Sequence, residues 1–427
     1  MSKDLHGPLP GSGFAAKGFD YTEGTARKRC DNWVNRANRE RNRMRFSIDA
    51  HAMGRKLTGN EVYVRNLLNC YPALDSSNEY VAYLSEQDAG RHLDDRIQTR
   101  GVSKNPFKRL GWDLTRHLRR DQPDLLHVQY TAPLSCPVPL VVSVHDVSFV
   151  ERPEFFPAAR VFQLQRTVPR TIRRAARILT PSEFSARAIQ RVYGTPAEKI
   201  TVVHNGVSSF YRPVAREQAQ GEVRARYGID GPYILTVGDL QPRKNQEGLI
   251  EAFESVMREH PELRHHLVLA GKATWQAERV RARAERSPFR ERIRFTGFVP
   301  DEDLVHLYGG CDLFAFPSFY EGFGIPILEA MACGRAVACS DTSATAEVAD
   351  GAALLFDPQK PREIGRAIRD ILIDGELRAR MERLGQQRAA QFQWRTAASK
   401  TLDTYYQVVE AGHRVSRDSR RAAAVPR

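Results

Sequence analysis

The sequence predicts an α/β protein with two domains, each built on a parallel sheet that helices cover on both faces. The chain has 427 residues, too many for one domain at roughly 150 residues each. Short apolar runs rich in β-branched residues alternate with helical patterns, which is typical of parallel sheets. A polar stretch from about Tyr211 to Gly231 divides this alternation into two series. Two such domains are expected to face each other, with a ligand cleft at the C-terminal ends of their strands.

The first ordered element is expected at Met44 to Asp49. Further strands of the first series are expected at Leu125 to Val128, Val141 to Val144, Ile178 to Thr180 and Ile200 to Val203. Those of the second series are expected at Tyr233 to Val237, Leu267 to Ala270, Ile293 to Thr296, Leu313 to Phe316, Ala336 to Cys339 and Ala353 to Phe356. The helix Asn245 to His260 places its apolar side chains on one face. The last helix carries an apolar stripe through Trp394, Tyr405 and Val408, which predicts that it docks on another element.

Charge and composition exclude several protein classes. The net charge is +13, but residues 1–43 and 413–427 each hold +4 of it, and no nucleic-acid-binding motif accompanies them. Solvated tails are the favoured reading, with a weak attraction to an anionic membrane surface as the functional alternative. No apolar run approaches the roughly 18 residues of a membrane-spanning helix, and no secretory signal is recognisable. Six cysteines without C-x-x-C pairs predict free thiols in a reducing, cytoplasmic compartment.

Together these patterns divide the chain into six segments: a disordered basic extension over 1–43, an N-terminal domain over 44–210, a linker over 211–231, a C-terminal domain over 232–393, a docking helix over 394–412 and a basic tail over 413–427.

The most informative stretch runs from Phe316 to Ala332. A strand is followed by the turn Gly322-Phe323-Gly324 and by a helix with Pro326 in its first turn, and such a helix start cradles phosphate. Glu321 precedes the helix and Glu329 lies inside it, about 12 Å away at 1.5 Å per residue. Glycosidase carboxylates lie roughly 5–9.5 Å apart, so this pair better suits hydroxyls at two points of an extended ligand.

Other candidate residues follow strands. Arg243 and Lys244 come after the strand Tyr233 to Val237 and suit a diphosphate. His145-Asp146 ends one strand of the first series, whereas His127 is more simply read as structural. Three other motifs lie elsewhere. Thr58-Gly59-Asn60 is expected in a loop that leads into a helix and could contact phosphate or sugar. Asp301-Glu302-Asp303 resembles a metal-binding motif but fits a helix start better. Gly11 to Ala16 matches a dinucleotide-binding fingerprint, but no strand precedes it, as that fingerprint requires.

These motifs, in this order, resemble glycosyltransferase family 4, the retaining nucleotide-sugar transferases of the GT-B fold, from about Met44 to about Ala411. The stretches that carry the resemblance are Thr58-Gly59-Asn60, His145-Asp146, Pro181 to Ser185, Asn205-Gly206-Val207, Gly238 to Asn245, Gly297-Phe298-Val299 and the Glu321/Glu329 motif. The resemblance implies two Rossmann-like domains, an N-terminal one for the acceptor and a C-terminal one for the donor, with the final helix crossing back to the N-terminal domain.

The resemblance also implies roles for single residues. Arg243 and Lys244 would hold the donor diphosphate, Glu329 the ribose hydroxyls and Glu321 the transferred sugar. His145 would lie beside that sugar, and His145, Glu321 and Lys244 are the expected catalytic residues. The remaining donor contacts would come from Val299 beside the base and from Phe323, Gly324 and Ile325, and Gly59 and Asn60 would form the acceptor or phosphate loop. Many members have Arg directly after the glycine where this chain has Asp239, so Arg243 is expected to supply that charge.

The expected function is retaining transfer of a hexosyl unit, such as mannosyl, from a nucleotide-diphosphate sugar to a glycan or lipid-linked acceptor in surface polysaccharide or glycoconjugate synthesis. No metal or other cofactor is expected, and no nucleic-acid partner. The location is expected to be cytoplasmic, peripheral to the inner face of the membrane at most. Two alternatives stay open: a nucleotide-sugar sensor of the same fold that lacks turnover, and a phosphorylase, for which no cofactor lysine is recognisable.

Overall fold

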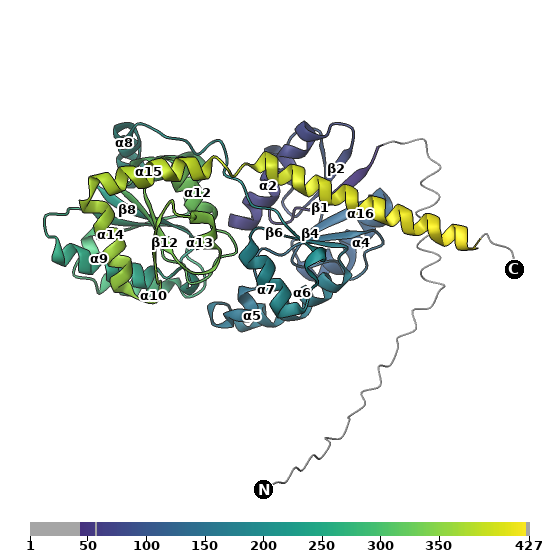
Figure 1. Cartoon of the computed structure of the whole chain (residues 1–427), viewed down its shortest axis with the longest axis horizontal. Coiled ribbons are helices and arrows are strands. Elements are labelled where there is room, and N and C mark those ends of the chain that lie inside the picture. Colours follow the sequence, from purple (N-terminus) through teal and green to yellow (C-terminus); the bar gives the residue numbers. More distant parts are fainter. Residues whose placement is uncertain (1–42, 56–57, 424–427) are drawn as a thin grey trace, which may run out of the picture. The chain divides into compact units, whose positions relative to one another are not determined.

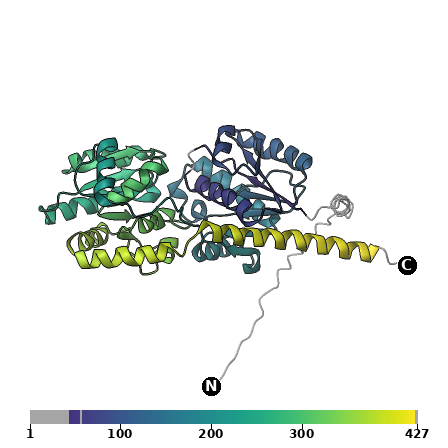
Figure 2. The same cartoon turned by 90° about the horizontal axis from the view of Figure 1, so that it is seen from above.

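The computed structural model describes residues 43–55 and 58–423, and side chains from 59 to 414 in its second part. Residues Arg43–Gly412 form one compact unit that contains both sheets (Figures 1 and 2). The other unit, Met1–Asn42 with His413–Arg427, lies largely outside the described residues. The extension expected to be disordered over 1–43, with its dinucleotide-like motif and Cys30, therefore also falls outside, apart from Arg43.

The first sheet is parallel, with strand order β3-β2-β1-β4-β5-β6-β7. Its strands are β1 (Arg45–Asp49), β2 (Glu79–Leu84), β3 (Ile97–Gly101), β4 (Leu125–Gln129), β5 (Leu140–Ser143), β6 (Arg177–Thr180) and β7 (Ile200–Val202). The helices between them are α2 (Thr58–Leu74), α3 (Pro106–Lys108), α4 (Leu114–Asp121), α5 (Ser148–Glu151), α6 (Ala158–Arg174) and α7 (Glu183–Tyr193).

The second sheet is also parallel, with strand order β10-β9-β8-β11-β12-β13. Its strands are β8 (Tyr233–Val237), β9 (His266–Ala270), β10 (Ile293–Gly297), β11 (Leu313–Phe316), β12 (Val337–Ser340) and β13 (Leu354–Phe356). The helices are α8 (Arg216–Tyr227), α9 (Gln246–Glu259), α10 (Ala277–Glu285), α11 (Asp301–Gly310), α12 (Ile325–Ala332), α13 (Ser343–Ala349), α14 (Pro361–Ile373), α15 (Gly375–Ala389) and α16 (Trp394–Ala423).

The predicted α/β architecture with two parallel sheets is confirmed. Strands β5, β11 and β12 are buried at every position, as expected of short apolar runs that helices cover on both faces. Figure 1 shows helices on both sides of each sheet. Strands β2 and β3 were not expected. The apolar run in β2 could have revealed it, but β3 is an edge strand with mostly exposed side chains and has no such run.

The polar stretch over 211–231 is more than a linker, because it contains helix α8. Ala219 and Val223 are the buried side chains of α8. The helix packs on α11, where a Cβ on Gly309 would lie 3.3 Å from the Cβ of Ala219. Only two of its side chains are buried, so the polar composition that suggested a linker is also that of a surface helix.

The prediction that the last helix crosses back is confirmed by its contacts with the first sheet. Trp394, Ala397, Leu402 and Val409 of α16 are buried in the same cluster as Phe46 of β1. The Tyr405 hydroxyl lies 3.2 Å from that of Tyr71 in α2. Both views show α16 running beside the first sheet and α2 (Figures 1 and 2). The helix continues to Ala423, into the segment expected to be a basic tail.

The two connections between the sheets pass each other at one point. The Val207 N–H donates to the Phe392 carbonyl at 3.0 Å. A Cβ on Gly206 would lie 2.1 Å from the backbone nitrogen of Trp394, so only glycine fits there. The Asn205-Gly206-Val207 segment and the start of α16 therefore form a closely packed crossing.

Candidate active site

A cavity of about 610 Å³ lies where the carboxyl ends of the two sheets meet. Its lining includes Tyr130 directly after β4, and Gly238 and Gly271 directly after β8 and β9. This edge is where parallel α/β sheets bind ligands. Every predicted site residue lines the cavity: Gly59, Asn60, His145, Arg243, Lys244, Val299, Glu321, Phe323, Gly324, Ile325 and Glu329.

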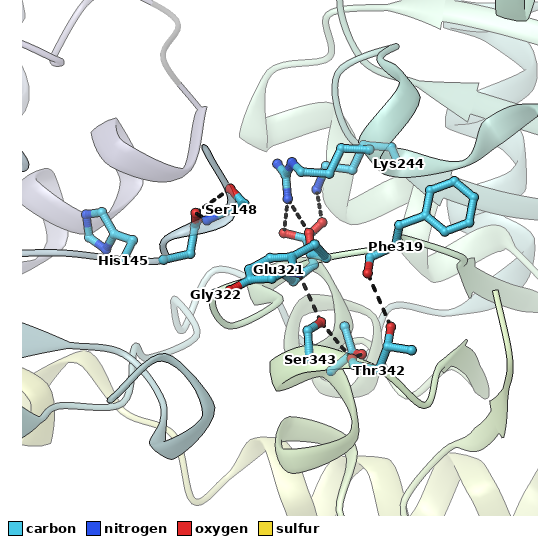
Figure 3. Close-up of polar contacts among 12 residues, drawn as sticks. His145, Ser148, Lys244, Phe319, Glu321, Gly322, Thr342 and Ser343 are labelled. Atoms are coloured by element: carbon cyan, nitrogen blue, oxygen red, sulfur yellow. Dashed lines mark hydrogen bonds and ion pairs between the residues drawn. The ribbon is translucent and has the colours of Figure 1, made fainter. Parts of the chain in front are cut away.

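Glu321 lies between β11 and α12 and is paired with two cations from the segment after β8. Lys244 Nζ donates to Glu321 Oε1 at 2.6 Å, and Arg243 Nη1 lies 2.9 Å from Oε2. Lys244 Nζ also lies 4.8 Å above the ring of Phe316, at the end of β11. Figure 3 shows the contact of Lys244 with Glu321, and Arg243 pairs with the same carboxylate. The cations predicted to meet a diphosphate are thus held together by one carboxylate.

The cluster joins two cations to one ionised carboxylate. Burial alone would raise the pKa of Glu321, but the charges of Arg243 and Lys244 outweigh burial and lower the pKa to about 2. Burial lowers the pKa of Lys244, and the Glu321 charge opposes that effect. With Glu321 ionised, two cations face one anion within the cluster, and the carboxylates of Asp146 and Asp239 in the cavity lining also act on Arg243 and Lys244.

The backbone around Glu321 is fixed on both sides (Figure 3). Its N–H donates to Ser343 Oγ at 3.0 Å, and its carbonyl accepts the N–H of Ala344 at 3.3 Å. The neighbouring Phe319 N–H donates to the Arg243 carbonyl at 2.9 Å. Because the start of α13 and the Arg243 segment both hold this turn, the carboxylate needs little reorganisation to meet a ligand.

The Gly-Phe-Gly turn brings the two domains into contact. A Cβ on Gly322 would lie 2.2 Å from the His145 carbonyl oxygen, so only glycine allows this approach. The Gly322 carbonyl accepts hydrogen bonds from Ser182 Oγ at 2.7 Å and Ser185 Oγ at 3.2 Å. Gly324 has φ +108° and caps α12, so the predicted helix start after the glycine turn is confirmed, with Pro326 in its first turn.

The flanking residues present mainly backbone to the cavity. The side chain of Phe323 is buried and packs against His204 and Phe392, with ring centroids 6.1 and 5.7 Å away. Ile325 is the first residue of α12. Val299 is buried two residues after β10. Polar contacts from Phe323 and Ile325 to a ligand would therefore come from their main chain.

Glu329 is buried inside α12 with a tyrosine as its partner. The Tyr308 hydroxyl donates to Glu329 Oε2 at 2.8 Å. Burial raises the pKa of Glu329 to about 7, against the lowering effect of the Tyr308 hydrogen bond and with a smaller raising effect from the Asp301 charge. The two carboxyl groups thus have different surroundings: Glu321 is paired with two cations, whereas Glu329 accepts from a tyrosine hydroxyl.

The acidic triplet Asp301-Glu302-Asp303 lies in the first turn of α11, as expected, with Pro300 at the N-cap. Asp301 Oδ2 accepts from Arg65 of α2 at 2.7 Å across the cavity. Asp301 Oδ1 accepts from the Tyr211 hydroxyl at 3.3 Å. Within residues 43–55 and 58–423, no cluster of three or more His, Cys, Asp or Glu side chains could hold a metal ion.

His145 follows β5, and its backbone carbonyl lies against Gly322 of the C-terminal domain. Its Nε2 lies 2.9 Å from Gln129 Oε1, and its carbonyl accepts from Ser185 Oγ at 2.9 Å. Burial lowers the pKa of His145 to about 4, and the charge of Asp146 opposes this only partly. The imidazole is therefore neutral at pH 7, able to donate from one nitrogen and accept with the other.

His127 has the structural role that was favoured for it. Its Nδ1 lies 2.6 Å from the Tyr405 hydroxyl and its Nε2 lies 2.7 Å from Ser143 Oγ. The Tyr63 hydroxyl lies 2.7 Å from the same Ser143 oxygen. This buried chain connects the first sheet with α2 and α16, and His127 does not line the cavity.

The prediction that Gly59 and Asn60 form a loop is wrong in its local structure. Both residues line the cavity, but helix α2 begins at Thr58 and includes them. Glu61 in the same turn accepts the Gly54 N–H at 2.8 Å, so a first-turn acid binds the chain that enters the helix. The polar Thr-Gly-Asn sequence suggested a loop, whereas it is a helix start.

The structure adds cavity residues that sequence reasoning missed: Arg65, Tyr130, Asn205 and Tyr211. Tyr130 has φ +59°, which is costly for a bulky residue and is typical of functional sites. Its position directly after β4 was the available signal. Asn205 is buried, and its Oδ1 has no hydrogen-bond partner among the described residues. Its place in the Asn205-Gly206-Val207 segment was the only hint.

Two further findings concern the whole described chain. Cys70, Cys311, Cys333 and Cys339 are free thiols, as expected. No helix in the described ranges is long and apolar enough to cross a membrane.

Comparisons with known proteins agree with this geometry. Residues 57–209 match the family described as Glycosyltransferase Family 4, and residues 220–388 match Glycosyl transferases group 1. The chain is 35% identical over 265 residues to O-antigen chain mannosyltransferase B of Escherichia coli, covering 62% of this chain and 69% of that one. It is 31% identical over 307 residues to D-inositol 3-phosphate glycosyltransferase of Streptomyces avermitilis, covering 67% and 64%. It is also 30% identical to the serotype-specific mannosyltransferase WbdA of Escherichia coli, covering 57% of this chain but only 30% of that one.

Solved structures show the same fold at lower identity. Sucrose-phosphate synthase from Thermosynechococcus elongatus superimposes with a TM-score of 0.72 at 18% identity, covering 86% of this chain and 100% of that one. Anabaena HepE in complex with UDP and glucose has a TM-score of 0.68 at 20% identity, covering 86% and 99%. At these identities the likeness concerns the fold alone. The two matched families and the Escherichia coli mannosyltransferase show that the chain belongs to glycosyltransferase family 4, and that it is a glycosyltransferase of the GT-B fold.

Proposed function

We propose that this glycosyltransferase moves a mannosyl or related hexosyl unit, with retention, from a nucleotide-diphosphate sugar to a glycan or lipid-linked acceptor during surface polysaccharide or glycoconjugate synthesis. The observation that carries the proposal is the pairing of Arg243 and Lys244 with Glu321 beside the start of α12, opposite His145. The names of two relatives support the proposed sugar and the proposed class of acceptor. One is an O-antigen chain mannosyltransferase, and the other is a D-inositol 3-phosphate glycosyltransferase.

The donor would lie along the C-terminal domain. Its diphosphate would take over Arg243 and Lys244 from Glu321 and meet the backbone N–H groups at the start of α12. Glu329 would accept from the ribose hydroxyls, and Glu321, once its cations turn to phosphate, would accept from hydroxyls of the transferred sugar. The main chain of Phe323, Gly324 and Ile325 would contact the sugar or phosphate, with Val299 beside the base.

The chemistry follows from where charge develops. As the sugar departs, negative charge grows on the nucleoside diphosphate, and a buried cation close to that oxygen stabilises the transition state more than the ground state. Lys244, whose Nζ lies 2.6 Å from Glu321 Oε1, would supply this charge once it turns to the diphosphate. The acceptor hydroxyl would attack from the face that the diphosphate leaves, which retains the configuration, and His145 would contact the sugar from the N-terminal domain.

The acceptor would enter along the N-terminal domain, past the first turn of α2 with Gly59 and Asn60. A cytoplasmic location is part of this proposal, and it is supported by the free thiols of Cys70, Cys311, Cys333 and Cys339.

We place a peripheral membrane contact on the same domain. Phe107 and Trp112 are 87% and 66% exposed. Leu134 is also exposed and lies beside their segment, because its N–H donates a hydrogen bond to the Leu110 carbonyl at 2.8 Å. The adjoining helix α6 contains no acidic residue and carries Arg160, Arg166, Arg170, Arg173 and Arg174. Exposed aromatics beside a cationic helix suit an anionic lipid surface.

Sedimentation with vesicles tests this contact. Wild-type protein should bind vesicles that contain anionic lipid and bind zwitterionic vesicles weakly. A Phe107→Ser/Trp112→Ser variant should lose binding, whereas a control that alters exposed apolar residues of the other domain, Leu355→Ser/Ile373→Ser, should not. Equal binding by both variants would contradict the assignment of this surface.

The alternative function is a nucleotide-sugar sensor with the same site but no turnover. Nucleotide release from a panel of GDP- and UDP-hexoses, with and without mannose-terminated acceptors, separates the two. We expect release from one donor to rise at least tenfold with an acceptor, with an α-linked product from an α-linked donor. Tight donor binding without acceptor-dependent release from any member of the panel would favour the sensor.

A further inference from the structure

The side chain of His145 is enclosed by residues from two elements of the N-terminal domain. The Tyr63 ring of α2 meets it edge-on with centroids 4.7 Å apart, and the Tyr130 ring lies 5.5 Å away. Gln129, the last residue of β4, reaches His145 Nε2 with its Oε1 at 2.9 Å. Gln129 is only 5% exposed, so water does not compete for this contact.

A second contact fixes which way the Gln129 amide points. Its Nε2 lies 3.3 Å from the backbone carbonyl of Asn60. A carbonyl oxygen can only accept, so the amino group of Gln129 must face Asn60 and its oxygen must face His145. The amide oxygen accepts, so His145 Nε2 must carry a proton.

The charged and titratable groups around the ring agree with a neutral imidazole. Asp146 is adjacent in sequence, and its Oδ1 accepts the Ser148 N–H at 2.9 Å. From β4 the facing titratable groups are His127 and Tyr130, and from α2 the facing group is Tyr63. Burial lowers the pKa of His145 to about 4 despite the Asp146 charge. A neutral ring protonated on Nε2 has an unprotonated Nδ1.

We propose that Gln129 is a positioning residue that sets the tautomer of His145, so that Nδ1 is left to accept a hydrogen bond from a substrate hydroxyl in the cavity. The inference rests on the proposed function, because it assumes a sugar beside His145. Through Asn60, the same amide ties His145 to the first turn of α2, which lines the acceptor side of the cavity. Gln129 thereby couples the position of α2 to the orientation of the histidine.

Two substitutions separate this role from simple packing. Gln129→Leu removes the acceptor at similar size, and kcat should fall roughly tenfold, as for loss of one well-placed hydrogen bond. Gln129→Glu keeps an acceptor for Nε2–H but places a carboxylate beside the ring, which favours the imidazolium. Activity should stay near wild type at pH 9, and the pH titration of the His145 NMR signals should move upward by about one pH unit or more. Gln98→Glu, an exposed change on β3 where Oε1 already accepts from Arg100 Nη2, adds the same charge away from His145 and should leave that titration unchanged.

Nitrogen-15 spectra of histidine-labelled protein read the tautomer without any activity. The His145 signals, identified by their loss in His145→Asn, should show a protonated Nε2 and an unprotonated Nδ1 in wild type, and a mixture of tautomers in Gln129→Leu. If the wild type transfers no sugar but shows this tautomer, the proposed function fails and the assignment to Gln129 stands. A protonated Nδ1 in wild type, or a His145 titration in Gln129→Glu that superimposes on that in Gln98→Glu, would overturn the proposal. Melting temperatures confirm that each variant is folded.

Discussion

At the scale of single residues, Glu329 shows how a group proposed to bind the donor can cost stability. Its pKa is about 7 in the folded chain against an ordinary value of 4.5, because burial disfavours the charged form. The folded state therefore holds the proton more tightly than the unfolded state. Its contribution to the free energy of unfolding is fully present below pH 4.5 and is lost as the pH rises towards 7, by on the order of 3 kcal/mol at 1.4 kcal/mol per pKa unit.

Glu329→Gln tests this description in one variant. Glutamine has the same shape and no charge, so the free energy of unfolding at pH 8 should exceed that of wild type by about 1–3 kcal/mol, and the difference should vanish near pH 4.5. Affinity for the donor nucleotide at pH 8 should fall at least tenfold, because a charged acceptor for the ribose hydroxyls is lost. Denaturant unfolding and calorimetry measure the two effects, with the exposed Glu376→Gln as control. A variant with neither gain in stability nor loss of affinity would contradict both statements.

At the scale of elements, the turn before α12 joins the proposed donor site to the N-terminal domain. Gly322 lies against the His145 backbone, and Ser182 and Ser185 bind its carbonyl. A side chain at this turn cannot be accommodated by moving a flexible group, because the nearest atom is a backbone oxygen.

Gly322→Ala should therefore displace the turn that carries Glu321 and lower kcat by at least tenfold, as expected when catalytic groups shift by about 1 Å. Gly375→Ala is the matched control, since a Cβ there would meet nothing within 4 Å and it opens helix α15. The control should keep full activity and equal or higher stability. Full activity in Gly322→Ala would show that the close approach to His145 is not needed for catalysis.

Sequence reasoning succeeded for elements whose signal is local. β11 was predicted with its observed bounds because a buried strand is a short apolar run, and the start of α12 was predicted from its glycines and proline. β3 escaped because edge strands lack such a run, and the start of α2 was taken for a loop because its residues are polar. The pairing of Lys244 with Glu321 joins residues 77 positions apart, and the Gln129–His145 contact needs two neighbouring strands, so neither was visible in the sequence.

At the scale of the whole molecule, the site is assembled from both domains by contacts that cross the cavity. Arg65 of α2 pairs with Asp301 of α11, and the crossing of Gly206 with Trp394 joins the two connections. In the proposed mechanism, Arg243, Lys244 and the start of α12 would supply the positive charge that meets the leaving group.

Transfer should therefore continue when divalent ions are removed. With EDTA present, kcat should stay within about twofold of the value with added Mg²⁺, because protein cations stabilise the departing diphosphate. A coupled assay of nucleotide release in metal-free buffer measures this. Loss of activity that Mg²⁺ or Mn²⁺ alone restores would show that the charge comes from a metal ion.

The central claim is that Arg243 and Lys244 bind the donor diphosphate, and that Glu321 pairs with both cations when no donor is bound. Calorimetric titration with GDP and UDP, for wild type, Lys244→Ala and Glu321→Gln, tests it most directly. Lys244→Ala should bind the preferred nucleotide at least tenfold more weakly, since a charge-assisted contact contributes about 1.5–3 kcal/mol. Glu321→Gln should bind it as tightly as wild type or more tightly, because the cations lose a competing anion, while turnover falls. Unchanged affinity in Lys244→Ala, or weaker binding in Glu321→Gln, would contradict the claim and place the diphosphate elsewhere.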